Sequence, residues 1–342
     1  MILKNIFLLS SILTLFASCQ KDELPLLAPN TNQNTNSIDT TGGENLIVKG
    51  EIISKTVHMG SDYATQIWFD LGTNSVIKTN LRTDWDLAFD CGLANNNLYL
   101  NSALNASVAF TSETDFNKVN SDAGLTYLFE HQSGRKELLA IGDISNNRSV
   151  FIIDRGYDPA GNPIGKWKAQ ITLVQEGDYF LTCAQLDGSN MQTTIISKKP
   201  QYNRVAYSFS SAKEIQIEPE KTDFDIVFTQ YTHVFENEIP PLPYSVNGVL
   251  INSYKTEVAE EFSKKFNELS KIHAETLFYS RDWDVIGYDW KDFSLQTNTF
   301  TIFSDKIYLI KDASGNLFKL RFIDFYDDNG IKGSPAFEFM RL

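Results

Sequence analysis

The chain has 342 residues, of which 42% are hydrophobic and 13% aromatic. This length allows two domains or one long β-architecture, and aromatic enrichment favours sheet. The formal net charge of −13 excludes nucleic-acid binding through a general basic field, so an anionic small ligand needs local Lys or Arg side chains.

The first 18 residues are predicted to be a signal peptide. Lys4 precedes an apolar run over residues 6–17, which is too short to span a bilayer as a helix, and small residues then lead to Cys19. The layout resembles a bacterial lipoprotein signal, although Phe16 stands where Leu is usual. The resemblance implies cleavage after residue 18 and lipidation of the Cys19 thiol, which anchors the chain to a membrane. The alternative is a plain secretory signal with an incidental Cys19.

The residues after Cys19 predict a location and a tether. Residues 20–23 read QKDE and resemble the surface-export tag of Bacteroidetes lipoproteins, which implies the outer face of the outer membrane. Residues 30–44 are rich in Asn and Thr, with almost no apolar side chains. We therefore expect a disordered tether over residues 19–45, followed by ordered chain from about Leu46.

Short strands separated by turn sequences are predicted along most of the remaining chain. They fall at residues 64–71, 75–79, 85–91, 95–100, 149–154, 166–174, 179–184, 192–197, 307–310, 317–325 and 336–341. Turn signals spaced roughly 8 to 12 residues apart are typical of an antiparallel β-sandwich or barrel. The predicted fold class is therefore all-β.

An Asp-aromatic-Asp motif occurs three times, in Thr83–Phe89, Thr222–Phe228 and Arg281–Gly287. We interpret it as a half-buried strand with both aspartates on the wet face. The first two copies are offset by 139 positions, and Tyr63 and Tyr202 match at the same offset. This repetition predicts two related β units, an N-terminal one over residues 46–198 and a C-terminal one over residues 199–342.

One segment has helical periodicity, Lys255–Thr276. Its apolar residues recur every three or four positions, which predicts an amphipathic helix, although its start also alternates as a strand would. The fold is therefore expected to contain at most one or two short helices.

Two cysteines follow Cys19, namely Cys91 and Cys183. In an oxidising compartment they either pair as a disulfide or remain two buried free thiols. The sequence leaves both possibilities open.

No motif in the chain indicates catalysis. The four histidines are His58, His131, His233 and His273, and none stands in a hydrolase motif. The chain also lacks a P-loop, a dinucleotide fingerprint, a paired-histidine zinc helix and a calcium loop. We therefore predict that the protein is not an enzyme.

Several segments resemble the HmuY-like lipoproteins of Bacteroidetes. They are Thr222–Asn252, Trp283–Trp290 and Leu317–Phe339, together with TDWDLAFDCG at residues 83–92. The resemblance implies a β-rich surface lipoprotein that binds haem or a related porphyrin. It also implies transfer of the ligand to a TonB-dependent outer-membrane receptor, and haem iron held by a pair of His or Met side chains.

His233 is the best candidate for an iron ligand, because it follows the Phe228 strand in a Tyr-Thr-His segment. The second ligand is left open, and the available thioethers are those of Met59, Met191 and Met340. His131 lies in a Gln-Ser-Gly loop and is expected to be solvated.

Two other functions remain open for the same surface. Trp167, Tyr288 and Trp290 are candidates for an aromatic platform that binds glycans. The third possibility is a structural surface protein without a small ligand.

Overall fold

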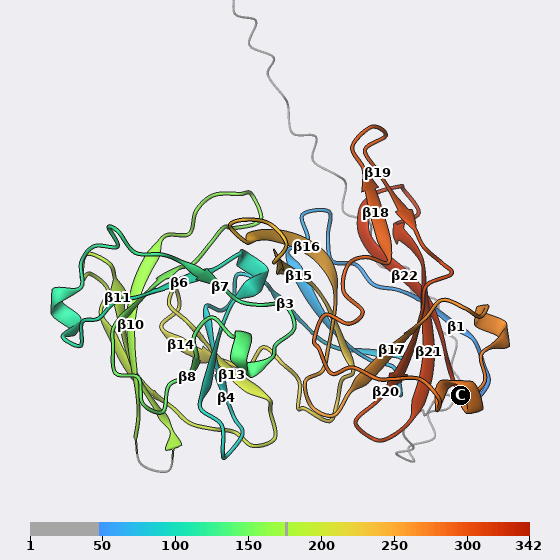
Figure 1. Ribbon diagram of the computed structural model, residues 1–342, viewed down its shortest axis with the longest axis horizontal. Helices are drawn as coiled ribbons and strands as arrows, with labels where there is room; N and C mark the ends of the chain where they lie inside the picture. Colours follow the sequence, from blue (N-terminus) through green and yellow to red (C-terminus); the bar gives the residue numbers. More distant parts are fainter. Residues whose placement is uncertain (1–47, 175–176) are drawn as a thin grey trace, which may run out of the picture. The chain divides into compact units, whose positions relative to one another are not determined.

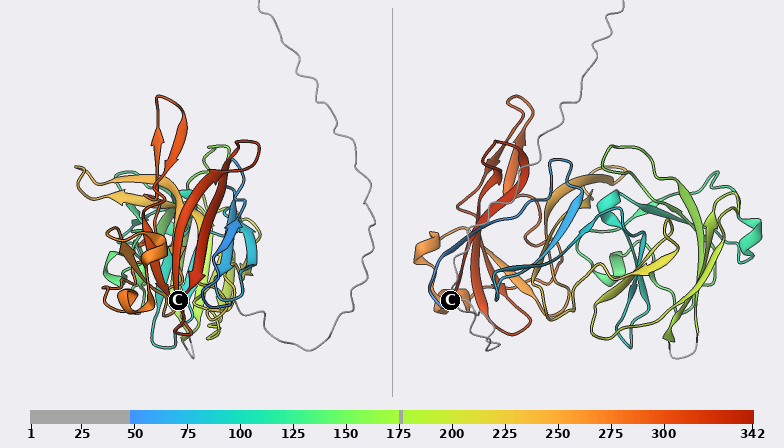
Figure 2. Two further views of the ribbon diagram at one scale, coloured as in Figure 1. Left: turned by 90° about the vertical axis from the view of Figure 1, so that its right-hand side faces the viewer. Right: turned by 180° about the vertical axis from the view of Figure 1, so that it is seen from behind.

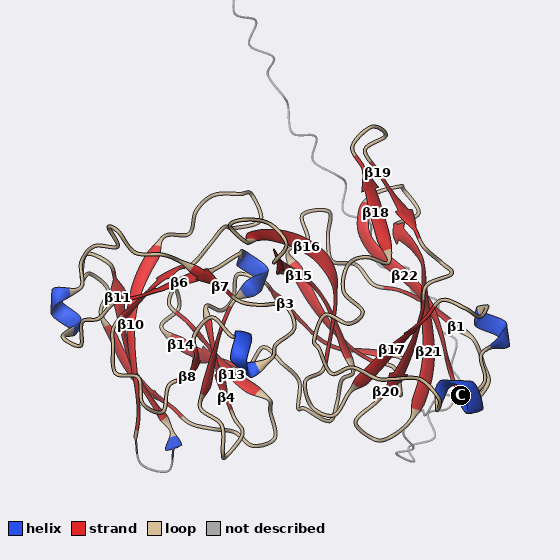
Figure 3. Ribbon diagram, viewed as in Figure 1, coloured by secondary structure: helices blue, strands red, loops and turns tan. Residues whose placement is uncertain are grey.

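The computed structural model describes residues 48–174 and 177–342 (Figure 1). The expected signal peptide (residues 1–18), the lipidation site Cys19 and the tether (residues 19–45) lie outside the described residues and stay predictions. The described residues all belong to one compact unit. Within the described part, strands make up most of the regular structure (Figure 3), which confirms the all-β fold class. None of its helices is long and apolar enough to cross a membrane.

Residues 87–215 form a β-sandwich that we call the first lobe. Its strands are β4 (Leu87–Asp90), β5 (Asn97–Leu100), β6 (Ser107–Phe110), β7 (Leu128–Phe129), β8 (Gly142–Asp143), β9 (Phe151–Asp154), β10 (Lys166–Leu173), β11 (Tyr179–Gln185), β12 (Gln192–Ile196), β13 (Arg204–Ser208) and β14 (Lys213–Ile215). One antiparallel sheet has the order β12-β11-β10-β9-β6-β7 and the other β14-β13-β4-β5-β8.

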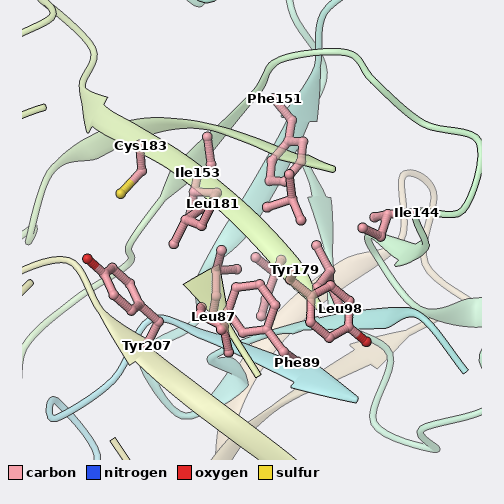
Figure 4. Close-up of a cluster of buried hydrophobic side chains, with 14 of the residues drawn as sticks. Leu87, Phe89, Leu98, Ile144, Phe151, Ile153, Tyr179, Leu181, Cys183 and Tyr207 are labelled. Carbon is pink, nitrogen blue, oxygen red and sulfur yellow. The ribbon is translucent and has the colours of Figure 1, made fainter. Parts of the chain in front are cut away.

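The core of the first lobe lies between these two sheets (Figure 4). Leu87 and Phe89 of β4 meet Tyr179 and Leu181 of β11, and the rings of Phe89 and Tyr179 are 5.2 Å apart. All four side chains are at most 1% exposed. Alternate residues of each strand therefore fill the core, as a sandwich requires.

The second lobe is a sandwich built from both ends of the described chain. Its strands are β1 (Ile53–Thr56), β2 (Thr65–Asp70), β3 (Ser75–Leu81), β15 (Ile226–Phe235), β16 (Leu242–Ile251), β17 (Glu257–Glu261), β20 (Ile307–Lys311), β21 (Leu317–Tyr326) and β22 (Lys332–Arg341). The sheet orders are β1-β22-β21-β20-β17 and β16-β15-β2-β3. A separate hairpin of β18 (Lys291–Ser294) and β19 (Thr299–Ile302) extends beyond this lobe (Figure 2).

Aromatic side chains dominate the core of the second lobe. Phe69, Phe228 and Phe337 are fully buried between its sheets. The ring of Phe337 lies 5.4 Å from that of Phe69 and 5.3 Å from that of Phe228. Such pairs add stability beyond the burial of their area, about 0.5–1.5 kcal/mol each.

The two lobes repeat one strand arrangement. The order β12-β11-β10-β9-β6 corresponds to β1-β22-β21-β20-β17, and β14-β13-β4-β5 corresponds to β3-β2-β15-β16. The first lobe is a continuous piece of chain, whereas β1, β2 and β3 complete the second lobe from the N-terminal side. The lobes named here are defined by strand pairing. The expected division of the chain between residues 198 and 199 stays a prediction.

In both lobes an asparagine side chain donates two hydrogen bonds to backbone carbonyls in or next to the motif. Asn101 donates from its amide nitrogen to the carbonyls of Arg82 (2.8 Å) and Trp85 (2.7 Å). Asn252 does the same for Lys221 (2.9 Å) and Phe224 (2.7 Å). This agreement of hydrogen bonds supports duplication of one structural unit.

The interpretation of the motif as a strand with two wet aspartates is wrong. The strands begin only at Leu87 and Ile226, and the preceding motif residues form a turn. Asp86 and Asp225 are 2% and 4% exposed. The reason is that each carboxylate accepts a backbone N–H from another strand segment, Phe209 for Asp86 (2.7 Å) and Leu71 for Asp225 (2.8 Å).

The predicted helix over residues 255–276 is largely absent. The start of this segment forms a strand, as the alternative prediction had it. Residues 257–261 form β17, in which Val258 pairs with Ile310 of β20. The segment's only α-helix is α1 (Lys271–Ala274), preceded by the 3₁₀ turn η5 (Phe266–Glu268). Other 3₁₀ turns are η1 (Ser102–Leu104), η2 (Phe116–Lys118) and η3 (Lys136–Leu138). Pairing with β20 outweighs the local periodicity, because the sheet buries Val258 completely.

Cys91 and Cys183 are both buried free thiols, the second of the two possibilities left open. Burial raises the pKa of Cys91 to about 11 and that of Cys183 to about 12. Both thiols therefore remain protonated and unreactive at neutral pH.

Candidate functional site

A cavity of about 70 Å³ lies where the two lobes meet. The aromatic residues of all three motif copies, Trp85, Phe224 and Trp283, line it. The repetition of the motif was visible in the sequence, but its convergence was not. Only the pairing of distant strands brings the three copies together.

A cation already occupies the aromatic side of this cavity. The Arg204 guanidinium lies 4.4 Å from the ring centroid of Trp283 and 5.1 Å from that of Tyr99. Its Nε donates to Glu218 Oε1 at 2.6 Å. Stacking and pairing together offset the cost of removing this ion pair from water.

The loop of residues 130–135, which we call the junction loop, is anchored in the first lobe by Glu130. Its carboxylate accepts the N–H groups of Leu100 (2.8 Å) and Ala140 (3.1 Å). Burial raises the pKa of Glu130 to about 7, against the effect of these two hydrogen bonds. The buried carboxyl therefore fixes the base of the loop.

The junction loop is held against the second lobe by three contacts. Val234 N donates to Gln132 Oε1 at 3.0 Å, and Trp283 N donates to the Ser133 carbonyl at 2.9 Å. Arg135 donates twice to the Asp282 carboxylate, at 2.8 and 2.6 Å. These contacts place the loop beside the strand that carries His233.

Gly134 allows this close approach. Its φ is 65°, and a Cβ at this position would lie 2.1 Å from the indole of Trp283. A side chain here is excluded by both the backbone conformation and the lack of space.

His131 lies on the junction loop and is not solvated as expected. Its side chain is 15% exposed, and Nε2 lies 3.2 Å from Glu236 Oε1. Nδ1 hydrogen-bonds Ser133 Oγ at 2.8 Å. Nothing in the sequence around His131 signals this position, because Glu236 lies far along the chain, in the turn after β15.

His233 lies on β15 between two aromatic rings, Phe235 at 4.8 Å and Tyr288 at 5.2 Å. Its Nδ1 is buried and has no hydrogen-bond partner among the described residues. Burial lowers the pKa of His233, and the nearby His131 lowers it further. The imidazole is therefore neutral at pH 7, and its Nδ1 is not engaged in a hydrogen bond. A metal ligand requires both properties.

A cleft of about 290 Å³ opens beside His233. Tyr231 and Tyr288 contribute to its walls, as does Asp284, whose Oδ2 lies 3.9 Å from His233 Nδ1. Burial raises the pKa of Asp284 to about 6, and the neighbouring carboxylates act in the same direction. Asp284 belongs to the third copy of the motif. The corresponding residues Asp86 and Asp225 are buried, whereas Asp284 lines a cleft.

The thioethers considered as partners of His233 do not line this cleft. Met59 is fully buried in the core of the second lobe, and Met191 is 57% exposed beside β12 in the first lobe. Met340 lies on β22 in the outer sheet. His131 does not line this cleft either, and it lines the cavity at the junction of the lobes instead.

The expected aromatic platform does not form. Trp167 is 5% exposed and Trp290 1% exposed, because each packs in the core of its lobe. Only Tyr288 of the three reaches the cleft.

The family model described as HmuY protein matches residues 62–339. The chain belongs to the HmuY family. This match covers well over half of the chain and confirms the resemblance seen in the sequence. No curated protein matches the chain.

Three solved structures are similar to this HmuY-family chain. A putative HmuY-like haem-binding protein from Bacteroides vulgatus is 16% identical and covers 40% of this chain and 83% of its own, with a TM-score of 0.21. Apo PinO from Porphyromonas gingivitis is 11% identical and covers 85% of this chain and 97% of its own, with a TM-score of 0.29. An apo HmuY analogue from Tannerella forsythia is 11% identical and covers 85% and 96%, with a TM-score of 0.24. The family assignment rests on the sequence model alone.

Proposed function

We propose that the protein binds haem or a related porphyrin, with His233 as one axial ligand and His131 as the candidate for the second. The observation that carries this proposal is the buried Nδ1 of His233, which has no hydrogen-bond partner among the described residues, on a side chain that lines a cleft. One similar structure is described as a HmuY-like haem-binding protein, which agrees with this choice. A bound haem supplies an iron that takes two axial ligands.

The donor set fits the iron of a haem. Two imidazoles are suitable axial ligands, and Phe235 and Tyr288 supply apolar surface beside His233. Among residues 48–174 and 177–342, no group of three or more His, Cys, Asp or Glu side chains is arranged to hold a bare metal ion. These features favour iron that arrives inside a porphyrin over a free cation.

We further propose that the protein is a lipoprotein of the outer membrane surface, anchored through Cys19, which passes its ligand to a TonB-dependent receptor. The signal-like residues 1–18, the QKDE sequence after Cys19 and membership of the HmuY family support this proposal. The role is binding and delivery of a ligand rather than catalysis.

A hemin titration of residues 45–342 followed by absorbance tests the binding. We expect a Soret band that shifts and saturates, and at least about tenfold weaker binding for His233→Ala, as for loss of a metal ligand or its support. His131→Ala should also weaken binding and alter the spectrum, since the iron loses one ligand.

The matched control is His58→Ala, because His58 is an exposed histidine that hydrogen-bonds Ser334 away from the cleft. An unchanged titration for both His233→Ala and His131→Ala would contradict the assignment of the ligands. A glycan binder would instead retain polysaccharide and leave the hemin spectrum unchanged. Burial of Trp167 and Trp290 argues against that alternative.

A further inference from the structure

The cleft beside His233 is strongly acidic. Four carboxylate side chains line it, those of Glu260, Asp282, Asp284 and Asp289, and no Lys or Arg is among the lining residues. A flat ligand that enters here meets carboxylates on several sides.

Among the described residues, two cations pair with these acids from outside the cleft. Arg135 pairs with Asp282, and Lys306 bridges Glu260 at 2.8 Å and Asp289 at 2.7 Å. Four negative and two positive charges leave a formal charge of −2. Both cations are already engaged, so neither is free to receive a carboxylate from a ligand.

Asp284 is the acid without a cationic partner. Its side chain is 19% exposed, and His233 Nδ1 lies 3.9 Å from its carboxylate. That distance is too long for a hydrogen bond. Asp284 therefore presents an uncompensated carboxylate at the point where a ligand of His233 would lie.

A second unpartnered group points to a ligand at this end of the cleft. Tyr231 is 1% exposed, lines the cleft, and its hydroxyl has no hydrogen-bond partner among the described residues. The hydroxyl faces Gly287, where an added Cβ would lie 3.5 Å from it. Buried hydroxyls are normally satisfied, so this one indicates a polar partner that enters from the cleft.

We propose that this cleft selects its ligand by charge, so that the edge of a flat ligand directed toward Asp284 and Tyr231 carries no carboxylate. The proposal rests on the proposed function and names its ligand class. The buried edge is uncharged or carries hydrogen-bond donors, and any carboxylates stay at the solvent-facing rim. Two carboxylates side by side in a partly desolvated cleft repel one another, and no free cation offsets that repulsion.

Two ligands that differ only in charge test this selection. Hemin carries two propionates, and its dimethyl ester carries none. Both are titrated into residues 45–342 in the same dilute detergent at fixed pH. We expect the ester to bind at least about tenfold more tightly, a modest part of the repulsion between like charges at an effective dielectric constant of about 20.

Asp284→Asn assigns the effect to one residue. It should strengthen hemin binding and reduce the preference for the ester to about threefold or less. The control Asp292→Asn removes the same charge from an exposed site on β18 and should leave the preference unchanged. Thermal melts establish that each variant is folded.

An iron-free pair, protoporphyrin IX and its dimethyl ester, gives a readout that does not depend on axial ligation. Quenching of the intrinsic tryptophan fluorescence should show the same preference for the ester. Equal affinities for acid and ester, or tighter binding of the acid, would overturn charge selection while leaving haem binding intact. Absence of binding by every porphyrin would instead overturn the proposed function, and the charge selection with it.

Discussion

The two lobes neutralise an equivalent buried aspartate in different ways. In the first lobe, Asp86 pairs with Arg155, whose Nε donates to Asp86 Oδ1 at 2.6 Å. In the second lobe, Asp225 has no such cation. Burial raises its pKa well above the ordinary value, and the nearby Asp70 carboxyl raises it further. The protonated form is therefore favoured where the Asp225 and Asp70 carboxyls lie close together.

This difference shows what the position requires. Each aspartate must accept a backbone N–H from a segment distant in the chain, and its charge must be compensated because the site is dry. An ion pair and a bound proton both meet that need. The two lobes therefore share the hydrogen bond and differ in how the charge is compensated.

The lobes also differ in the length of one hairpin, and the candidate site depends on it. β4 has four residues, whereas the corresponding strand β15 has ten. The additional residues of β15 carry Tyr231 and His233, and β4 has no counterpart to them. The first lobe instead contributes the junction loop with His131, so the site draws on both copies.

The largest expected effect comes from breaking the ion pair of the first lobe. Arg155→Ala leaves the buried Asp86 without its cation and should lower the free energy of unfolding by about 3–5 kcal/mol. Urea denaturation measures the change. The double variant Arg155→Ala, Asp86→Asn should recover a part of it, and a loss below about 1 kcal/mol would mean that the lobes do not differ as described.

The asparagine bridges should contribute equally in the two lobes. Asn101→Ala and Asn252→Ala each leave two backbone carbonyls without their amide donor, which should cost about 2–3 kcal/mol by urea denaturation. A cost that differs by more than about 1.5 kcal/mol would show that the equivalence is geometric but not energetic.

A pair of buried lysines offers a matched test of smaller size. Lys168 Nζ donates to the carbonyls of Phe116 and Val119, and Lys319 Nζ donates to those of Phe266 and Leu269. Burial lowers the pKa of both lysines. Lys168→Met and Lys319→Met should each cost about 1–2 kcal/mol, because the packing is kept and the hydrogen bonds are lost. Unequal changes in melting temperature for the two variants would show that the two lysines are not equivalent.

The smallest expected effect is a stabilisation in the second lobe that depends on pH. The folded-state pKa of Asp225 is raised, so the folded protein binds this proton more tightly than the unfolded chain does. Its contribution is present below the unfolded pKa of about 3.9 and is lost as pH rises through the folded pKa. Asp225→Asn should therefore flatten that slope and add about 1 kcal/mol at pH 7, since the amide oxygen still accepts from Leu71.

Asp86→Asn is the control for this pH dependence. It leaves Arg155 buried without its carboxylate and should destabilise the first lobe at the same pH. If both asparagine variants change stability in the same direction, the two lobes neutralise their aspartates alike and the comparison fails.

The sequence by itself determined the strands and their duplication. Alternation over segments such as Lys166–Leu173 and the turn residues between strands are local features, so their positions could be read without knowledge of the fold. The offset that links Asp84 to Asp223 likewise survives in the order of residues. His233 could be singled out because it follows a strong strand pattern.

Only the tertiary structure decided which of these residues meet. Asp86 and Asp225 are buried because their N–H donors, Phe209 and Leu71, arrive on strands from elsewhere in the chain. His131 reaches the junction of the lobes on a loop of the first lobe. Long-range strand pairing decides such meetings, and alternation within one strand carries no information about its partner.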